Sequence, residues 1–157
     1  MAPEPTDQDY RRLLELRTGL RRFLHWSERQ ARAAGLTPAQ HQLLLAIRGH
    51  HDPRGPTVGD IAGYLLLRHH SAVGLIDRAE AVGLVERIQD TSNLSVVRLR
   101  LTDEGSGKLE GLSELHLEEL AHLAPTMHAM WDALERGSDG APRRMPHPAG
   151  RAASDAA

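Results

Sequence analysis

The side chains of this sequence that could do chemistry are mainly arginines and histidines, and one dense group of them stands at the start of a predicted helix. That helix spans residues 68–82, and the group consists of Arg68, His69, His70 and Ser71. All four side chains can donate hydrogen bonds, and both histidines gain a charge as the pH falls. Donors at the N-terminal end of a helix suit contact with phosphates or with the edges of bases.

The helix over 68–82 has two different faces when its residues are placed about 100° apart. One face is apolar and predicted to pack inward, and it contains Ala72, Ile76, Ala79 and Gly83, with Leu75 at its flank. The opposite face has mostly short side chains, and it contains His70, Gly74, Asp77 and Ala81, flanked by Ser71 and Arg78. A helix that enters a DNA major groove, about 12 Å wide, needs such an outer face. The pattern fits a simply exposed helix equally well.

Ten histidines also invite a metal hypothesis. Zinc ligands on a helix stand three or four residues apart, with a carboxylate nearby. His116 with Glu119 and His122 with Glu118 have that spacing, and Glu118 is a second carboxylate near His116. A histidine on an apolar stripe is more often a hydrogen-bonded packing residue, so we expect neither a metal nor another cofactor. The absence of cysteine excludes disulfides, thiolate ligands and thiol-based redox sensing.

Composition and motifs narrow the class of protein further. The chain has 157 residues, 40% hydrophobic and 25% charged, with a net charge of −2. It contains no long apolar run and no basic, apolar leader, so we expect no membrane contact and a cytoplasmic location. A glycine-rich phosphate loop after a strand, a G-x-S-x-G elbow and a paired metal motif are all missing, so we expect no enzyme.

Local signals predict mostly helices around one small hairpin. Apolar residues at steps of three and four, with threonine caps and terminating glycines, predict helices over 7–34, 37–48, 57–66 and 68–82. Two β-prone runs, 84–89 and 96–101, follow. A further helix starts at 102 and is expected to break at Pro125, leaving a last short helix over 127–135. Residues 1–6 and 137–157 are expected to be disordered. The predicted fold is mainly α with a small β-hairpin, an α+β winged helix-turn-helix plan.

The helix pair and hairpin resemble those of the MarR family of bacterial regulators. The residues that carry the resemblance are Ile61-Ala62, Asp77-Arg78, Gly83-Leu84-Val85-Glu86-Arg87 and Leu101-Thr102-Asp103-Glu104-Gly105, in the order and spacing of the family. The resemblance implies a MarR-like domain over 7–136. Its winged-helix part is 37–102, and 7–34 and 103–136 are dimerisation helices from both chain ends.

The resemblance implies a homodimer that binds a pseudo-palindromic operator in double-stranded DNA. It assigns DNA contact to the predicted helix 68–82 and to both wing strands, through Arg68, His69, His70, Ser71, Gly74, Arg78, Arg87, Arg98 and Arg100. The wing departs from the family, whose tip carries arginine, because residues 90–95 contain no cation. Residues 54–102 hold six arginines against five acids. We therefore expect weaker and less salt-sensitive DNA binding than is usual in the family.

The resemblance also implies a ligand site, between the first helix, the helix pair and the dimerisation helices. Arg22, His25, Trp26 and His41 could line a cavity for a small aromatic or anionic effector. The alternative is that Trp26 is buried in a dimer contact. For the whole chain the predicted function is a sequence-specific transcriptional regulator, a repressor, released by a ligand. The alternative function is a winged-helix protein-interaction module with weakened or lost DNA binding.

Overall fold

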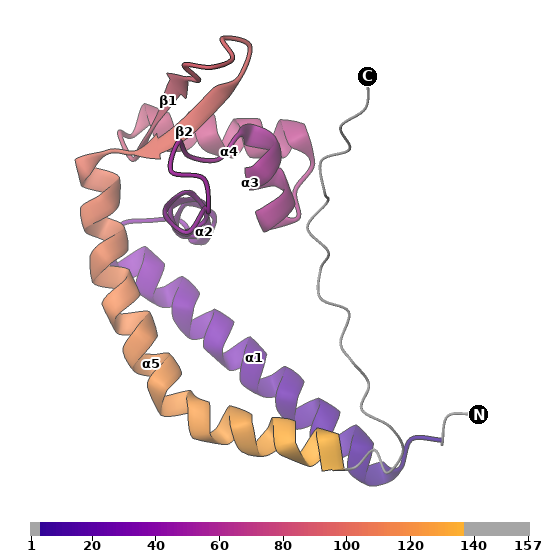
Figure 1. Cartoon of the computed structure of the whole chain (residues 1–157). Helices are drawn as coiled ribbons and strands as arrows, with labels where there is room; N and C mark the ends of the chain where they lie inside the picture. Colours follow the sequence, from indigo (N-terminus) through magenta and orange to yellow (C-terminus); the bar gives the residue numbers. More distant parts are fainter. Residues whose placement is uncertain (1–3, 137–157) are drawn as a thin grey trace, which may run out of the picture.

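The computed structural model describes residues 4–136, which form five helices and one hairpin (Figure 1). In chain order these are α1 (Asp7–Ala33), α2 (Pro38–Arg48), α3 (Val58–Leu65), α4 (His69–Ala81), β1 (Val85–Gln89), β2 (Val97–Leu101) and α5 (Asp103–Arg136). The predicted α+β winged-helix plan is confirmed. The predicted ends of the first four helices agree with the structure to within one residue.

Threonine caps explain where three of the helices begin. Thr6, Thr37 and Thr57 each accept a hydrogen bond from the backbone N–H three residues later. In each case the side chain of that third residue bonds back to the threonine N–H, which completes a capping box. Thr6, which the sequence analysis placed in a disordered N-terminus, is therefore the cap of α1.

The prediction of a helix break at Pro125 is wrong. Helix α5 is continuous from Asp103 to Arg136 and contains Pro125, so no separate helix exists over 127–135. A proline removes one backbone hydrogen bond and need not end a long helix whose other bonds remain. The predicted disordered segment 137–157 and residues 1–3 lie outside the described residues.

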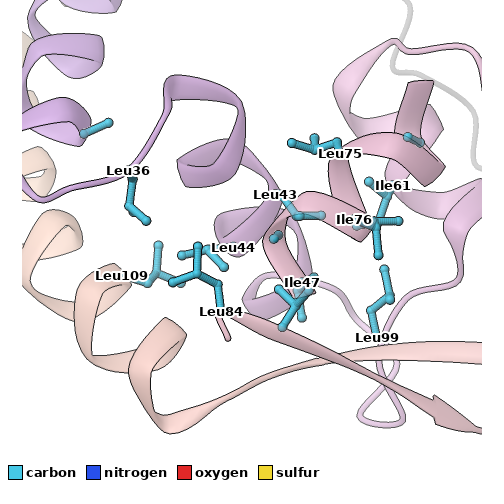
Figure 2. Close-up of a cluster of buried hydrophobic side chains, with 14 of the residues drawn as sticks. Leu36, Leu43, Leu44, Ile47, Ile61, Leu75, Ile76, Leu84, Leu99 and Leu109 are labelled. Atoms are coloured by element: carbon cyan, nitrogen blue, oxygen red, sulfur yellow. The ribbon is translucent and has the colours of Figure 1, made fainter. Parts of the chain in front are cut away.

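The core lies where α2, α3, α4 and the hairpin meet (Figure 2). Leu43 and Leu44 of α2, Ile61 of α3, Ile76 of α4 and Leu99 of β2 are completely buried. Strands β1 and β2 pair antiparallel, with Val85 opposite Leu101 and Gln89 opposite Val97. The core holds helix α4 and the hairpin in one rigid unit.

Helices α1 and α5 extend away from this unit and converge at the end far from the hairpin (Figure 1). The start of α5 is held against the winged part at Gly105, because a Cβ there would lie 2.1 Å from the carbonyl oxygen of Leu84. Only glycine allows that approach. Within residues 4–136 no helix is both long and apolar enough to cross a membrane.

Candidate nucleic-acid interface

Helix α4 presents the face that the sequence analysis predicted to be outward. Ala72, Leu75, Ile76 and Ala79 are buried, and they fix the rotation of the helix about its axis. On the other side the side chains of Arg68, His69, His70 and Arg78 are exposed, while Ser71 and Gly74 are partly buried. The packing of the apolar side therefore leaves Arg68, His69, His70 and Arg78 open to solvent.

The N-terminal end of α4 carries backbone donors as well. Arg68 is the N-cap residue and makes no side-chain cap hydrogen bond. Its carbonyl oxygen accepts from the N–H groups of Ser71, at 3.0 Å, and Ala72, at 3.1 Å. The partial positive charge of a helix start adds to the charge of an arginine side chain there. An anion would be attracted to this end of the helix.

Ser71 and Gly74 give the middle of α4 short side chains beside the long side chain of Arg78. A Cβ added at Gly74 would lie 3.3 Å from Nη1 of Arg78, so the Arg78 guanidinium lies close to the glycine. Ser71 stands one turn before it. The middle of the helix therefore offers one long cationic side chain beside short ones.

Arg87, predicted to contact DNA from the wing, is held between β1 and α4. Its guanidinium donates to Asp77 Oδ1 at 2.6 Å and to Glu80, and its backbone N–H donates to Glu80 Oε1 at 3.2 Å. Burial lowers the pKa of Arg87, but the hydrogen bonds to the two carboxylates outweigh this effect and raise it. Arg87 joins the wing to Asp77 and Glu80 of α4, and its charge is largely compensated there.

Arg98 is also engaged inside the protein. Its Nε donates to Asp90 Oδ2 at 2.9 Å and its Nη1 to the carbonyl oxygen of Gly55 at 3.0 Å, and the side chain is only 13% exposed. Asp90 is buried and accepts hydrogen bonds from Ser92 Oγ and from the N–H of Ser92. These bonds and that from Arg98 hold the pKa of Asp90 far below its usual range.

Arg100 is the wing arginine that remains most open. Its Nε donates to Glu86 Oε1 at 2.7 Å across the hairpin, yet its side chain is 62% exposed. Arg100 can therefore turn toward a phosphate at the cost of one exposed ion pair. DNA contact stays a prediction for every residue named above.

Arg54 is a cation near the wing that the sequence analysis did not assign. It lies on the loop between α2 and α3, and its Nη1 is 3.2 Å from Ser92 Oγ at the start of the wing tip. The two residues are separated by 38 positions in the chain. No local pattern signals a contact over that separation, so only the folded chain brings them together.

The predicted ligand-site residues are only partly brought together. Trp26 and His41 both pack on His116 of α5, with ring centroids 4.8 Å apart in each pair. Arg22 and His25 are exposed on α1. Burial, and then the neighbouring His116, lower the pKa of His41, which favours its neutral form. The rings form a packed junction of α1, α2 and α5.

His116 is a hydrogen-bonded packing residue in this junction. Its Nδ1 lies 2.7 Å from the Leu112 carbonyl oxygen, and its Nε2 lies 2.7 Å from Ser27 Oγ. Over the described part of the chain no three His, Asp or Glu side chains are grouped as a metal ion would require.

Two shallow cavities lie elsewhere on the surface. One, of about 350 Å³, is lined by Gln42, Leu45, Ala46, Gly49, Tyr64 and Leu65. The other, of about 370 Å³, lies between Arg48, Leu101 and one side of α5. Neither includes a residue of the predicted ligand site.

A helix pair whose second helix exposes donors and is followed by a hairpin defines the winged helix-turn-helix class. Residues 34–92 match the model of the MarR family. The match covers less than half of the chain, and with the fold of residues 4–136 it shows a winged-helix protein similar to those of the MarR family. No curated protein gave a significant match.

Three solved structures illustrate the likeness. The first is a MarR family transcription regulator, with a TM-score of 0.68 and 21% identity over 83% of this chain and 90% of that one. The second is S. aureus MepR in complex with DNA, with a TM-score of 0.63 and 19% identity over 85% and 97%. The third is the repressor CouR bound to a DNA duplex, with a TM-score of 0.62 and 24% identity over 87% and 99%. At these identities the likeness shows the fold.

Proposed function

We propose that this protein is a sequence-specific transcriptional regulator that binds operator DNA as a homodimer. The observation that carries the proposal is the exposed face of α4, where Arg68, His69 and His70 surround the positive end of a helix fixed by its buried opposite side. Short side chains further along, at Ser71 and Gly74, allow the helix axis to approach the floor of a major groove.

The structural neighbours support DNA as the partner. MepR and CouR, which share this fold, are both described in complex with DNA. In the proposed complex α4 reads base edges from the major groove, and Arg100 positions the duplex through a phosphate. The protein is then a binding protein rather than an enzyme, and it acts in the cytoplasm, beside the chromosome.

Two apolar helix faces support the homodimer. Large apolar side chains are exposed along both α1 and α5, namely Tyr10, Leu13, Leu14, Leu20, Leu24, Leu115, Leu117, Leu120 and Trp131. A monomer seldom exposes so much apolar surface on two adjacent helices. A second copy packed on the same faces would bury it, and a twofold axis would place the two α4 helices about one DNA turn, about 34 Å, apart.

Repression and release by a ligand are the finer parts of the proposal. A dimer covering a pseudo-palindromic operator would exclude polymerase by steric blocking. A small aromatic or anionic effector bound near Arg22, His25, Trp26 and His41 would act at the junction of α1, α2 and α5. Movement of that junction would change the spacing between the two α4 helices and release the DNA.

The alternative is a winged-helix module that binds a protein partner. It is favoured by the wing, where the tip residues 90–95 contain no cation and Arg87 and Arg98 are compensated by internal carboxylates. Such a wing attracts a duplex less than a wing with free arginines does.

A gel shift with duplexes covering the DNA upstream of the gene separates the two functions. The regulator gives a discrete complex that a random duplex of equal length does not compete away. A variant with Arg68→Gln, His69→Gln and His70→Gln should lose that complex while keeping its thermal melting. Sedimentation should show a dimer in both proteins. An upstream duplex that stays free at micromolar protein would favour the interaction module.

A further inference from the structure

We propose that Arg54, on the loop between α2 and α3, is a DNA-phosphate contact that supplies the wing with the cation its tip lacks. The proposal rests on the proposed function, since it requires that the winged part binds DNA. It concerns a residue outside both the predicted reading helix and the hairpin.

The loop that carries Arg54 is fixed against the wing. Gly55 has a φ of +91°, and a Cβ there would lie 2.1 Å from the Leu99 carbonyl oxygen, so only glycine permits the contact. The N–H of Leu99 donates to the Pro56 carbonyl oxygen at 2.9 Å, and Thr57 forms a β-bridge with Arg98. The loop therefore runs along the free edge of β2, and its position is set by backbone contacts.

Arg54 projects from this edge toward the wing tip. One side of its guanidinium, through Nε and Nη2, is held by Asp52, with Nη2 at 2.7 Å from Oδ2. The other side, through Nη1, reaches Ser92 Oγ at 3.2 Å and Asp90 Oδ2 at 3.4 Å. The side chain remains 52% exposed, against 13% for Arg98 and 27% for Arg87.

The carboxylates around Arg54 determine how strongly it can contribute to DNA binding. Asp52 and Asp90 both stand beside it, and Arg98 shares both carboxylates, at 3.5 Å from Asp52 and 2.9 Å from Asp90. A planar guanidinium held in one orientation matches a phosphate well, and because the Arg54 side chain is 52% exposed, a phosphate could bind it beside the carboxylates. One such contact changes the slope of log affinity against log salt concentration by about one. Asp52 should weaken the contact, because it competes for the same cation.

Arg54 could instead serve only to hold the wing in place, through Ser92 and Asp90. The two roles give opposite signs for a change at Asp52. If Arg54 contacts DNA, Asp52→Asn removes a competing negative charge and strengthens DNA binding. If Arg54 only holds the wing in position, Asp52→Asn removes one of the contacts that orient Arg54. DNA binding then becomes weaker, as it does for Arg54→Gln.

The test uses fluorescence anisotropy of labelled duplexes, one covering the upstream DNA and one of random sequence, at several salt concentrations. Arg54→Gln should lower the salt slope by about one for each protomer, hence by about two for the homodimer, and so reduce the loss of affinity between 50 and 200 mM salt by roughly tenfold. Arg32→Gln is the matched control, because Arg32 is 58% exposed and ion-paired with Glu28 on α1. It should leave both the slope and the affinity unchanged.

The outcomes separate this proposal from the proposed function. Binding by the wild type, a lower slope for Arg54→Gln and tighter binding for Asp52→Asn support the phosphate contact. An unchanged slope for Arg54→Gln, with weaker binding for Asp52→Asn, overturns it and leaves the regulator intact. If the wild-type protein binds neither duplex at low salt, the proposed function fails and the contact fails with it.

Discussion

Helix α4 and the wing both carry arginines, but the protein uses those arginines in different ways. Ion pairs within the described residues occupy Arg87, Arg98 and Arg100 of the wing, and none is found for Arg78 of α4 or for Arg68, its N-cap residue. The wing arginines hold the hairpin to α4 and to the loop before α3. Those of α4 remain available to a partner.

The difference shows that the net charge of a segment does not tell which of its charged side chains are free to attract a partner. Residues 54–102 contain almost equal numbers of positive and negative side chains, but the two kinds are not evenly distributed over the fold. Asp77 and Glu80 of α4 lie beside Arg87, because the hairpin packs against α4, and Asp90 of the wing lies beside Arg98 within the hairpin. On α4 and its N-cap, Arg68 and Arg78 are in no ion pair within the described residues, so their positive charges are not compensated in this way.

A negative charge on the open face of α4 should have the largest effect on DNA binding. Gly74→Glu places a carboxylate against the duplex, and we expect an affinity loss of about 100-fold or more, because like charges at an interface cost several kcal/mol. The fold should tolerate the change, since the atom nearest a Cβ is the end of the flexible Arg78 side chain. Anisotropy and thermal melting measure the two effects.

Gly111→Glu is the control for that substitution. Gly111 lies on α5, is exposed and has no atom within 4 Å of an added Cβ. It should leave DNA affinity nearly unchanged. Equal losses for both variants would show that net charge, rather than the open face of α4, governs binding.

Loss of Arg98 should affect stability more than DNA contact. Arg98→Gln leaves the buried carboxylate of Asp90 without its best cation, so we expect the melting temperature to fall by about 5 °C. Circular dichroism melting checks this. A variant that melts like the wild type but binds DNA poorly would show that Arg98 acts on DNA directly.

Acidification should weaken the junction of α1, α2 and α5. The pKa of His41 is lowered from 6.5, by burial and then by His116, so the folded state binds this proton less readily than the unfolded chain. The free energy of unfolding should therefore fall as the pH drops below about 6.5, until the lowered pKa is passed.

A pair of histidine variants tests that pH dependence by melting between pH 5 and 7.5. His41→Gln should show a smaller fall in melting temperature than the wild type. His128→Gln, on an exposed part of α5, should behave like the wild type. An unaltered pH dependence in His41→Gln would place the responsible proton elsewhere.

The smallest effect is expected for Arg100. Its ion pair with Glu86 is exposed, so Arg100→Gln should change the free energy of unfolding by about 0.5 kcal/mol or less. If Arg100 also positions a phosphate, the salt slope of DNA binding should fall by about one or less for each protomer of the dimer. A fall in DNA affinity as large as that of Gly74→Glu would contradict the proposal that α4 contributes more to DNA binding than the wing does.

Much of the fold could be predicted from local signals. Thr37 followed by Pro38, and Thr57 three residues before Asp60, mark helix starts because caps and first-turn residues act over one helical turn. The polar run 90–95 between two β-prone runs marked the hairpin in the same way. The prediction failed at Pro125, because the unfavourable effect of one proline did not end α5, whose other residues continue the helix.

The candidate surface was predictable where a single helix determines it. The spacing of Ala72, Ile76 and Ala79 fixed which side of α4 packs inward, and so which side is open. The pairing of Arg54 with Ser92, or of His41 with His116, depends on elements far apart in the chain. Helical periodicity contains no information about such pairs.

The sequence by itself determined the class of protein, the order of its elements and the outward donors of α4, because capping and periodicity act within a few residues. Only the tertiary structure decided which arginines remain open. An ion pair depends on distances of a few ångströms between side chains from different elements, as for Arg98 with Asp90 and Asp52. Packing of the hairpin on α4 and on the loop of Arg54 sets those distances.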